Sequence, residues 1–234
     1  MISIIIPVLN ESENIVKLLA HLSNKTSAEN SLEIIVIDGG STDDTAQLVA
    51  GFSEKNSLSV RLITSEKGRA KQMNAGAKKA AGEVLYFLHA DSFPPKDFDR
   101  YIKTSLNEGA DAGSFRMKFD SNHPVLKVSQ WFTKFNYKFC RGGDQSLFVK
   151  KAVFQQLQGY KESFIVYEDC EFIGRIYDEY TFNVINAYLT TSARKYRKNG
   201  TVTLQYHFTV IHLKKLFGAS PENLSNYYQK HIAS

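Results

Sequence analysis

The sequence predicts an α/β fold in which helices flank a mostly parallel sheet, with a helical extension at the C-terminus. Two observations predict it. In the first half of the chain, short strands that are apolar throughout alternate with helical segments, a pattern typical of a parallel sheet covered on both faces. No internal repeat, low-complexity segment or Pro/Gly/Ser-rich linker divides the 234 residues, so a single domain over 1–234 is expected.

Residues 1–92 are expected to form a nucleotide-binding half. In the first helix, Leu18, Leu19 and Leu22 share one face, as packing on a sheet requires. The second helix is expected to start at Ser41, whose hydroxyl would cap it. Strands are predicted at 3–8, 32–37, 58–64 and 83–88, and helices at 13–23, from 41 onward and at 70–81.

Residues 93–200 are expected to form an acceptor-binding and catalytic half, and 201–234 a helical tail. Strands are predicted at 112–119, 146–149, 182–185 and 188–192, and helices at 124–139, 150–157, 168–180 and 202–217, the last followed by a polar tail. The aromatic run from Trp131 to Phe139 is interpreted as core, because large aromatic residues are usually buried. An acceptor wall, a dimer contact and a membrane-facing patch are the alternatives for this run.

Composition and charge narrow the class of protein. The net charge of +5 favours phosphorylated ligands or anionic lipid, but the basic residues are scattered, which argues against a nucleic-acid-binding tail. Cys140 and Cys170 form no disulfide framework and are interpreted as reduced thiols. No signal peptide is expected, because the N-terminal apolar run is short and lacks a basic region before it. No apolar run approaches the ~18 residues of a membrane span, so a cytoplasmic protein is expected, and peripheral contact with the inner membrane face stays open.

Polar side chains follow three of the predicted strands where each strand ends. The carboxyl ends of parallel strands meet at one edge of the sheet, and ligands of such sheets bind beyond that edge. These side chains are therefore expected to converge on a ligand site. They are Asn10, Glu11, Asp38, Ser41, His89 and Asp91.

Two of these strand ends have both a ligand-binding and a structural interpretation. Asp91 is a rigidly placed carboxylate of the kind that holds a divalent cation together with a diphosphate, although an aspartate here can also cap the next helix. The segment from Asp38 to Asp44 would let a ligand approach the backbone and would place an anion at a helix start. It is equally typical of a capped turn.

Three further clusters are candidates for chemistry. Arg69 and Lys71 at a helix start favour a bound anion, or form a solvated basic face. The acidic run at 168–171 contains a candidate general base, or is an acid-rich first helical turn. The basic run at 192–197 would close over a diphosphate, or is a surface charge run, and the His207 and His212 pair is interpreted as structural.

Taken together and in this order, six segments resemble the family 2 glycosyltransferases of the GT-A fold, which is Rossmann-like. The segments are 3–11, 35–45, 68–76, 88–92, 143–145 and 168–169. The Leu-His-Ala-Asp form of the fourth segment and Thr-Ser-Ala-Arg at 191–194 also resemble the bacterial subgroup named radical-SAM/selenodomain-associated transferases.

The resemblance implies roles for the matching positions. Asp169 would be the catalytic base, and Asp91 would bind Mg²⁺ or Mn²⁺. His89 stands where many relatives have the first acid of Asp-x-Asp, and would contact a phosphate or add a metal ligand. The nucleoside, usually uridine, would be held by Pro7, Asn10, Glu11 and Asp38 with Ser41 beside them, the donor by Arg69, Lys71 and Arg194, and the sugar and acceptor by Gly143, Asp144 and Gln145.

The function expected from this resemblance is metal-dependent transfer of a sugar, with inversion, from a nucleotide-diphosphate sugar (a UDP-sugar) to an unknown hydroxyl acceptor. A nucleotidyltransferase is the alternative enzyme. It would require a basic, glycine-rich loop after the first strand, whereas the loop Leu9–Ser12 is acidic. A non-catalytic nucleotide-sugar-binding scaffold is the other alternative, and the presence of both Asp91 and Asp169 argues against it. No nucleic-acid partner is expected, and a homodimer stays open.

Overall fold

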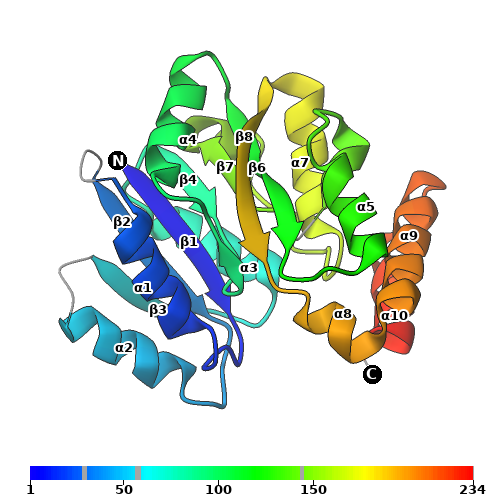
Figure 1. The fold of residues 1–234 in the computed structure, drawn as a ribbon, viewed down its shortest axis with the longest axis horizontal. Helices are drawn as coiled ribbons and strands as arrows, with labels where there is room; N and C mark the ends of the chain where they lie inside the picture. Colours follow the sequence, from blue (N-terminus) through cyan, green and yellow to red (C-terminus); the bar gives the residue numbers. More distant parts are fainter. Residues whose placement is uncertain (28–30, 56–58, 143–144, 234) are drawn as a thin grey trace.

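The computed structural model describes residues 1–27, 31–55, 59–142 and 145–233 as a single eight-stranded sheet with helices on both faces (Figure 1). The strands are β1 (Ile2–Val8), β2 (Leu32–Asp38), β3 (Val60–Thr64), β4 (Val84–Phe87), β5 (Ser92–Phe93), β6 (Ala112–Phe119), β7 (Leu147–Lys150) and β8 (Phe182–Thr191). The helices are α1 (Ile15–Lys25), α2 (Thr45–Lys55), α3 (Arg69–Lys79), α4 (Phe98–Asn107), α5 (Pro124–Phe132), the 3-10 turn η1 (Lys138–Cys140), α6 (Lys151–Gln156), α7 (Glu168–Glu179), α8 (Arg194–Asn199), α9 (Thr201–Leu216) and α10 (Pro221–His231).

The sheet is mixed and mostly parallel, in the order β3-β2-β1-β4-β7-β6-β8-β5. The four strands of the N-terminal part run parallel, as predicted. β7 lies antiparallel between β4 and β6, and its first residue, Leu147, lies opposite Phe87 at the end of β4. The segment before β7, which includes Gln145, therefore reaches the same edge of the sheet as the ends of β1 and β4.

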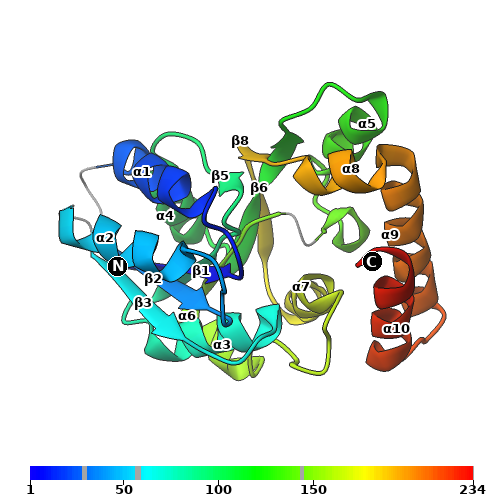
Figure 2. The same cartoon turned by 90° about the horizontal axis from the view of Figure 1, so that it is seen from below.

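Two hydrophobic layers cover the sheet because side chains alternate between its faces. Ile4 and Ile6 point to the layer under α1, α2 and α4, and Ile5 points to the layer under α3, α6 and α7. Figure 2 shows these helices on opposite sides of the sheet, with α5 and α8 to α10 gathered at one end of the molecule. Among the described residues, no helix is both long and apolar enough to cross a bilayer.

The C-terminal tail is helical as far as His231, where the sequence predicted a helix over 202–217 and then a polar tail. Ser220 caps α10 by accepting a hydrogen bond from the backbone nitrogen of Asn223 at 3.3 Å, and Pro221 occupies the first turn. α9 buries Leu204 and Ile211 against the rest of the fold. The side chain of Ser129 on α5 donates to Gln205 on α9 at 3.3 Å, so α5 and α9 lie side by side.

Three other predicted elements differ from the structure. The helix predicted over 124–139 ends at Phe132, because the Thr133 hydroxyl bonds to the Gln130 carbonyl and ties this turn to β6 through the backbone nitrogen of Met117. The two strands predicted over 182–192 form the single strand β8, whose irregular pairing with β6 absorbs two extra residues. The second helix begins at Thr45 rather than at Ser41, whose hydroxyl binds elsewhere.

The aromatic run is exposed, which contradicts its interpretation as core. Trp131 is 52% exposed, Tyr137 59% and Phe139 78%. The rings pack mainly on one another, for example Trp131 on Phe135 with centroids 4.8 Å apart. Of α5, only Leu126 is buried.

Candidate active site

A cleft of about 490 Å³ opens at the carboxyl ends of β1 and β4, between the start of α3 and α8. Side chains from four separate parts of the chain reach it because the parallel strands end at this edge. Six of the predicted site residues line the cleft: Pro7, Glu11, Arg69, His89, Asp91 and Arg194.

Hydrogen bonds join the loops that follow β1 and β2 beside the cleft. Asp38 Oδ1 accepts hydrogen bonds from the Ser41 hydroxyl at 2.6 Å and from the Ser41 backbone nitrogen at 3.0 Å. The Ser41 hydroxyl oxygen accepts from the Asn10 backbone nitrogen at 2.9 Å, and Asn10 Oδ1 accepts from the Thr42 backbone nitrogen at 2.8 Å. Asn10 adopts a left-handed conformation with φ 55°, which asparagine tolerates better than most residues. In the described part of the chain, the cleft wall includes none of Asn10, Asp38 and Ser41.

An ion pair joins the two sides of the cleft. Arg194 Nη2 lies 2.8 Å from Glu11 Oε1, although the two residues are 183 positions apart. This hydrogen bond, with further attraction to Glu11 and Asp91, raises the pKa of Arg194 above its ordinary value. The backbone oxygen of Asp91 also accepts from the Ser192 backbone nitrogen at 3.1 Å, so the residue before β5 is held to the end of β8.

Asp169 lies at the start of α7 and contacts two residues of the cleft wall. Its Oδ2 is 3.2 Å from Arg69 Nη2 and 4.0 Å from His89 Nε2. Arg69 Nε also lies 2.5 Å from Oε1 of Glu168, whose side chain is fully buried. Asp169 is 5% exposed, so Arg69 and His89 connect a nearly buried carboxylate to the cleft.

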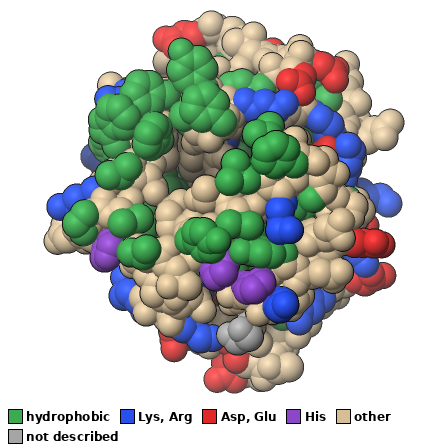
Figure 3. Space-filling view, turned by 90° about the vertical axis from the view of Figure 1, so that its right-hand side faces the viewer, with side chains coloured by type: hydrophobic (Ala, Val, Ile, Leu, Met, Phe, Trp, Pro, Cys, Tyr) green, Lys and Arg blue, Asp and Glu red, His purple; other side chains and the backbone are tan. Residues whose placement is uncertain are grey.

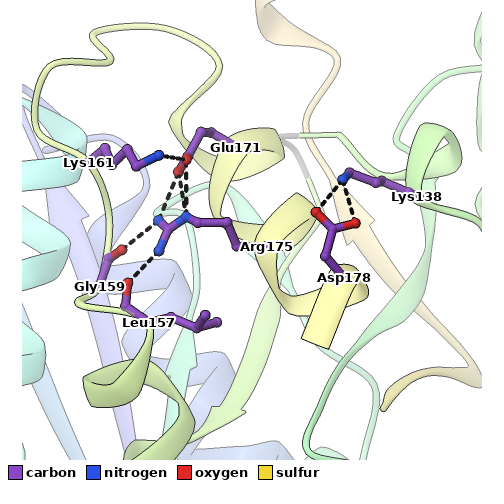
Figure 4. Close-up of polar contacts among 7 residues, drawn as sticks. All are labelled: Lys138, Leu157, Gly159, Lys161, Glu171, Arg175 and Asp178. Carbon is purple, nitrogen blue, oxygen red and sulfur yellow. Dashed lines mark hydrogen bonds and ion pairs between the residues drawn. The ribbon is translucent and has the colours of Figure 1, made fainter. Parts of the chain in front are cut away.

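The acidic run at 168–171 forms an acid-rich first turn of α7, one of its two predicted interpretations, and its three carboxylates do not share one set of partners. Glu171 faces away from the cleft and pairs with Arg175 at 2.8 Å and Lys161 at 2.7 Å (Figure 4). Burial alone would raise the pKa of Glu171, but the hydrogen bonds from Arg175 and Lys161 lower it below its ordinary value. Only Glu168 and Asp169 share a partner, Arg69.

Lys71 also lies apart from the other predicted residues. Its ammonium group pairs with Glu66, a contact that raises the pKa of Lys71. Among the residues that the structure describes, Lys71 is absent from the cleft wall, whereas Arg69, two residues earlier, is part of it. Of the two cations that were expected to face a bound anion, only Arg69 lines the cleft, and anion binding by Arg69 stays a prediction.

The segment before β7 is described only in part. Gly143 and Asp144 lie outside the described residues. Gln145 is 5% exposed, and its Nε2 donates to the Cys140 carbonyl at 3.0 Å. Its Oε1 is buried and has no hydrogen-bond partner within the described chain.

Asp91 and His89 are the candidate ligands of a divalent cation in the cleft. No group of three or more His, Cys, Asp and Glu side chains in the described chain could hold a metal ion. Asp91 fits a cation that takes its remaining ligands from a diphosphate and water. His89 Nε2 lies 4.0 Å from Asp169 Oδ2. A histidine that ligates a metal through one ring nitrogen commonly contacts a carboxylate through the other, so the role of His89 as a metal ligand stays a prediction.

Three residues of the cleft wall were missed in the sequence. Gln72 Nε2 donates to the carbonyls of Val8 and Ile37, both at 2.8 Å, and so braces the ends of β1 and β2. The sequence signal for Gln72 was its position one turn after Gly68, within the segment 68–76. Lys67 and Lys198 also line the cleft and add to its positive charge, which suits an anionic ligand.

Comparison with known proteins identifies the family. The family described as Glycosyl transferase family 2 matches residues 3–162, more than half of the chain. The chain belongs to this family. The match covers the cleft wall as far as Asp91, but not Asp169 or the wall residues at 191–198.

Relatives and solved structures agree with this assignment. A Methanococcus voltae protein, named dolichyl N-acetyl-alpha-D-glucosaminyl phosphate 3-beta-D-2,3-diacetamido-2,3-dideoxy-beta-D-glucuronosyltransferase, is 29% identical over 220 residues, which cover 83% of this chain and 68% of that protein. Glycosyltransferase AglE of Haloferax volcanii is 31% identical over 120 residues, covering 50% of this chain but only 40% of AglE. The chain thus spans well under half of AglE.

Two structural neighbours share the fold at low sequence identity. Residues 1–349 of S. aureus TarS, crystallised with UDP, give a TM-score of 0.70 at 21% identity, covering 82% of this chain and 60% of that one. The Pyrobaculum calidifontis mannosyltransferase PcManGT, in complex with GDP-Man and Mn²⁺, gives a TM-score of 0.70 at 19% identity, covering 100% and 64%. These likenesses confirm the predicted α/β architecture.

Proposed function

We propose that this glycosyltransferase moves a sugar from a UDP-sugar to a hydroxyl acceptor, with inversion at the anomeric carbon. The observation that carries the proposal is the contact of Asp169 with Arg69 and His89, two residues of a cleft that also contains Asp91. One carboxylate lies at the edge of the cleft as a base, while another lies at a strand end where a cation and a diphosphate would meet.

In the proposed reaction Asp169 accepts the proton of the acceptor hydroxyl as its oxygen bonds to the anomeric carbon. The bond from that carbon to the diphosphate oxygen breaks, and its electron pair leaves with the nucleoside diphosphate. Arg69 holds the Asp169 carboxylate at 3.2 Å before the acceptor arrives. With one base and no covalent intermediate, a single displacement inverts the anomeric configuration.

The leaving diphosphate gains negative charge, and the cleft supplies cations to balance it. Arg194, Lys67 and Lys198 line the wall around Asp91. A divalent cation held by Asp91 would supply further positive charge at the departing phosphates. Arg194 forms an ion pair with Glu11, so a diphosphate that binds Arg194 must compete with this ion pair.

The choice of donor and the finer assignments are part of this proposal. The TarS neighbours were crystallised in complex with UDP and UDP-GlcNAc, which supports a uridine nucleotide held near Pro7 and the Asn10–Asp38 loops. We place nucleotide binding in residues 1–92, the acceptor side in 93–200 and the helical tail in 201–234. Membership of the radical-SAM/selenodomain-associated subgroup stays a prediction.

Calorimetry with UDP tests the cation-binding role of Asp91. The parental protein should bind UDP more tightly in Mn²⁺ than in EDTA, and Asp91→Asn should lose about tenfold or more of that metal-dependent gain. Asp178→Asn is the matched control, since Asp178 pairs with Lys138 on the far side of α7 (Figure 4). Equal metal-dependent affinity in Asp91→Asn and the parental protein would reject the role. A thermal-shift screen of nucleotide sugars then identifies the donor.

A further inference from the structure

α9 carries apolar side chains on two opposite faces. One face, with Leu204 and Ile211, packs on the fold, whereas the residues at 202, 206, 213 and 216 follow the spacing of a second helical stripe. That second stripe faces solvent. Its exposed fractions are 64% for Val202, 63% for Tyr206, 48% for Leu213, 77% for Leu216 and, just beyond the helix, 84% for Phe217.

α5, which lies beside α9, adds a second group of exposed apolar side chains. Val128 is 58% exposed, Trp131 52% and Phe132 44%. We call the exposed side chains of Val128, Trp131, Phe132, Val202, Tyr206, Leu213, Leu216 and Phe217 the α5–α9 surface. Figure 3 faces this end of the molecule and shows hydrophobic side chains gathered in groups around a hollow. Apolar surface gathered in this way on a soluble protein marks a binding surface.

The charge of the two segments that build this surface indicates the kind of partner. Residues 121–143 and 180–221 contain ten Lys and Arg and no Asp or Glu. The whole chain has 29 basic and 24 acidic residues. The rest of the chain therefore has 19 basic and 24 acidic residues and a negative net charge. Of the ten, Arg141 is buried and Lys138, Arg194 and Arg197 pair with carboxylates elsewhere in the chain, which leaves six lysines on or next to α5, α8 and α9. In Figure 3 red side chains lie only toward the margins of that face.

Several of these cations rest on aromatic rings rather than on carboxylates. Lys134 Nζ lies 4.0 Å from the centroid of Trp131, and Lys215 Nζ lies 5.0 Å from that of Phe164. No carboxylate within the described residues forms an ion pair with Lys127, Lys134, Lys195, Lys198, Lys214 or Lys215. Long cationic side chains beside Trp, Tyr and Phe suit the interface of a bilayer, where the rings enter the lipid and the ammonium groups reach phosphate.

We propose that the α5–α9 surface binds the surface of an anionic lipid bilayer. The apolar stripe would supply buried area, and the uncompensated lysines would supply attraction to negatively charged headgroups. α8 joins this surface to the site: it lines the cleft with Arg194, Lys195 and Lys198 and continues through Gly200 into α9. A bilayer bound here would therefore lie beside the cleft.

Trp131 provides a direct measurement, because it is the only tryptophan of the chain and is half exposed. The protein is mixed with vesicles of phosphatidylcholine, or of an equal mixture of phosphatidylcholine and phosphatidylglycerol. We expect flotation with the mixed vesicles, a blue shift of Trp131 emission and protection from iodide quenching. Unchanged emission together with absence from the floated vesicles overturns the proposal, and so does equal binding to both compositions.

Matched variants separate the surface from general charge and hydrophobicity. Lys214→Glu/Lys215→Glu should lose at least about twentyfold in partition, since each basic residue near an anionic surface contributes about fivefold. Lys78→Glu/Lys79→Glu changes the same pair in the last turn of α3 and should bind as the parental protein does. Equal losses in the two double variants would show non-specific attraction and overturn the proposal.

Exposed leucines provide the second pair of variants. Leu216→Ser should reduce partition several-fold, whereas Leu48→Ser on α2, at the opposite end of the molecule in Figures 1 and 2, should not. If the protein does not bind vesicles and instead forms a dimer that Leu216→Ser dissociates, the surface would be assigned to a contact with a second copy of the chain. The assays need no donor, so a negative result leaves the transferase proposal intact.

Discussion

The cleft and the α5–α9 surface depart from ordinary side-chain burial in opposite directions. At the cleft, the side chain of Glu168 is fully buried and that of Asp169 is 8% exposed, yet both are charged groups. At the α5–α9 surface, Leu216 and Phe217 are 77% and 84% exposed, yet both are apolar. The first region keeps charge inside the fold, and the second keeps hydrophobic area outside it.

The difference teaches how each region is stabilised without a ligand. A buried carboxylate needs a partner, and Arg69 supplies one to both Glu168 and Asp169, so the protein itself compensates the cleft charges. Exposed apolar side chains have no comparable partner. They are in contact with water before and after folding, so their exposure does not lower the free energy of unfolding. We therefore expect substitutions in the cleft to change activity and substitutions at the α5–α9 surface to leave folding unchanged.

The largest effect is expected from Asp169→Asn. Removal of the base should lower the rate of UDP release from the identified donor by about 10²–10⁴-fold, while UDP affinity is kept. Glu171→Gln, two residues along α7 but facing Lys161, should retain the parental rate. A parental rate in Asp169→Asn would assign proton transfer to another group and remove the functional contrast between the two sides of α7.

A matched pair of leucines tests the contrast in burial. Leu19 is fully buried on α1, so Leu19→Ala should lose about 3 kcal/mol and about 6–12 °C in Tm. Leu216 is 77% exposed, so Leu216→Ala should stay within about 0.5 kcal/mol of the parental protein. Urea and thermal unfolding measure both. A large loss in Leu216→Ala would mean that this surface is structural.

The smallest effect concerns the far side of α7 and depends on pH. The folded-state pKa of Glu171 is lowered, so its contribution to stability is present at neutral pH and is lost as the pH falls through that pKa. Glu171→Gln should cost about 1–2 kcal/mol near pH 7 and much less near pH 3. Urea unfolding at both pH values checks this. A pH-independent difference would show that lost packing, rather than charge, is responsible.

The part of the cleft at the strand ends was predictable, because its residues follow directly after apolar strands. Continuous apolar runs located β1, β2 and β4, and the parallel arrangement then required Glu11 and Asp91 to meet. The pairing of charged side chains was harder to predict from the sequence. Lys71 and Arg69 have the same charge two residues apart, and only their tertiary partners, Glu66 and Glu168, distinguish them.

The C-terminal part was less predictable for a related reason. The sequence patterns of a buried and an exposed apolar stripe are the same, so the aromatic run was assigned to the core although Phe139 is 78% exposed. Likewise, the extra residues in β8 are accommodated by irregular pairing with β6, a property of two strands together. Local patterns specify which residues belong to one face of an element but not what covers that face.

The sheet order also has a consequence for the order of folding events. Ser3 of β1 pairs with Glu33 of β2 across 30 positions, whereas Ser92 of β5 meets Thr191 of β8 across 99. Closing the longer loop costs about 1 kcal/mol more in chain entropy, and non-local pairing is slow. We therefore expect β1 and β2 to associate early and the β5–β8 junction late. Since Arg194 follows β8 directly, its side of the cleft would be among the last parts of the site to form on each refolding.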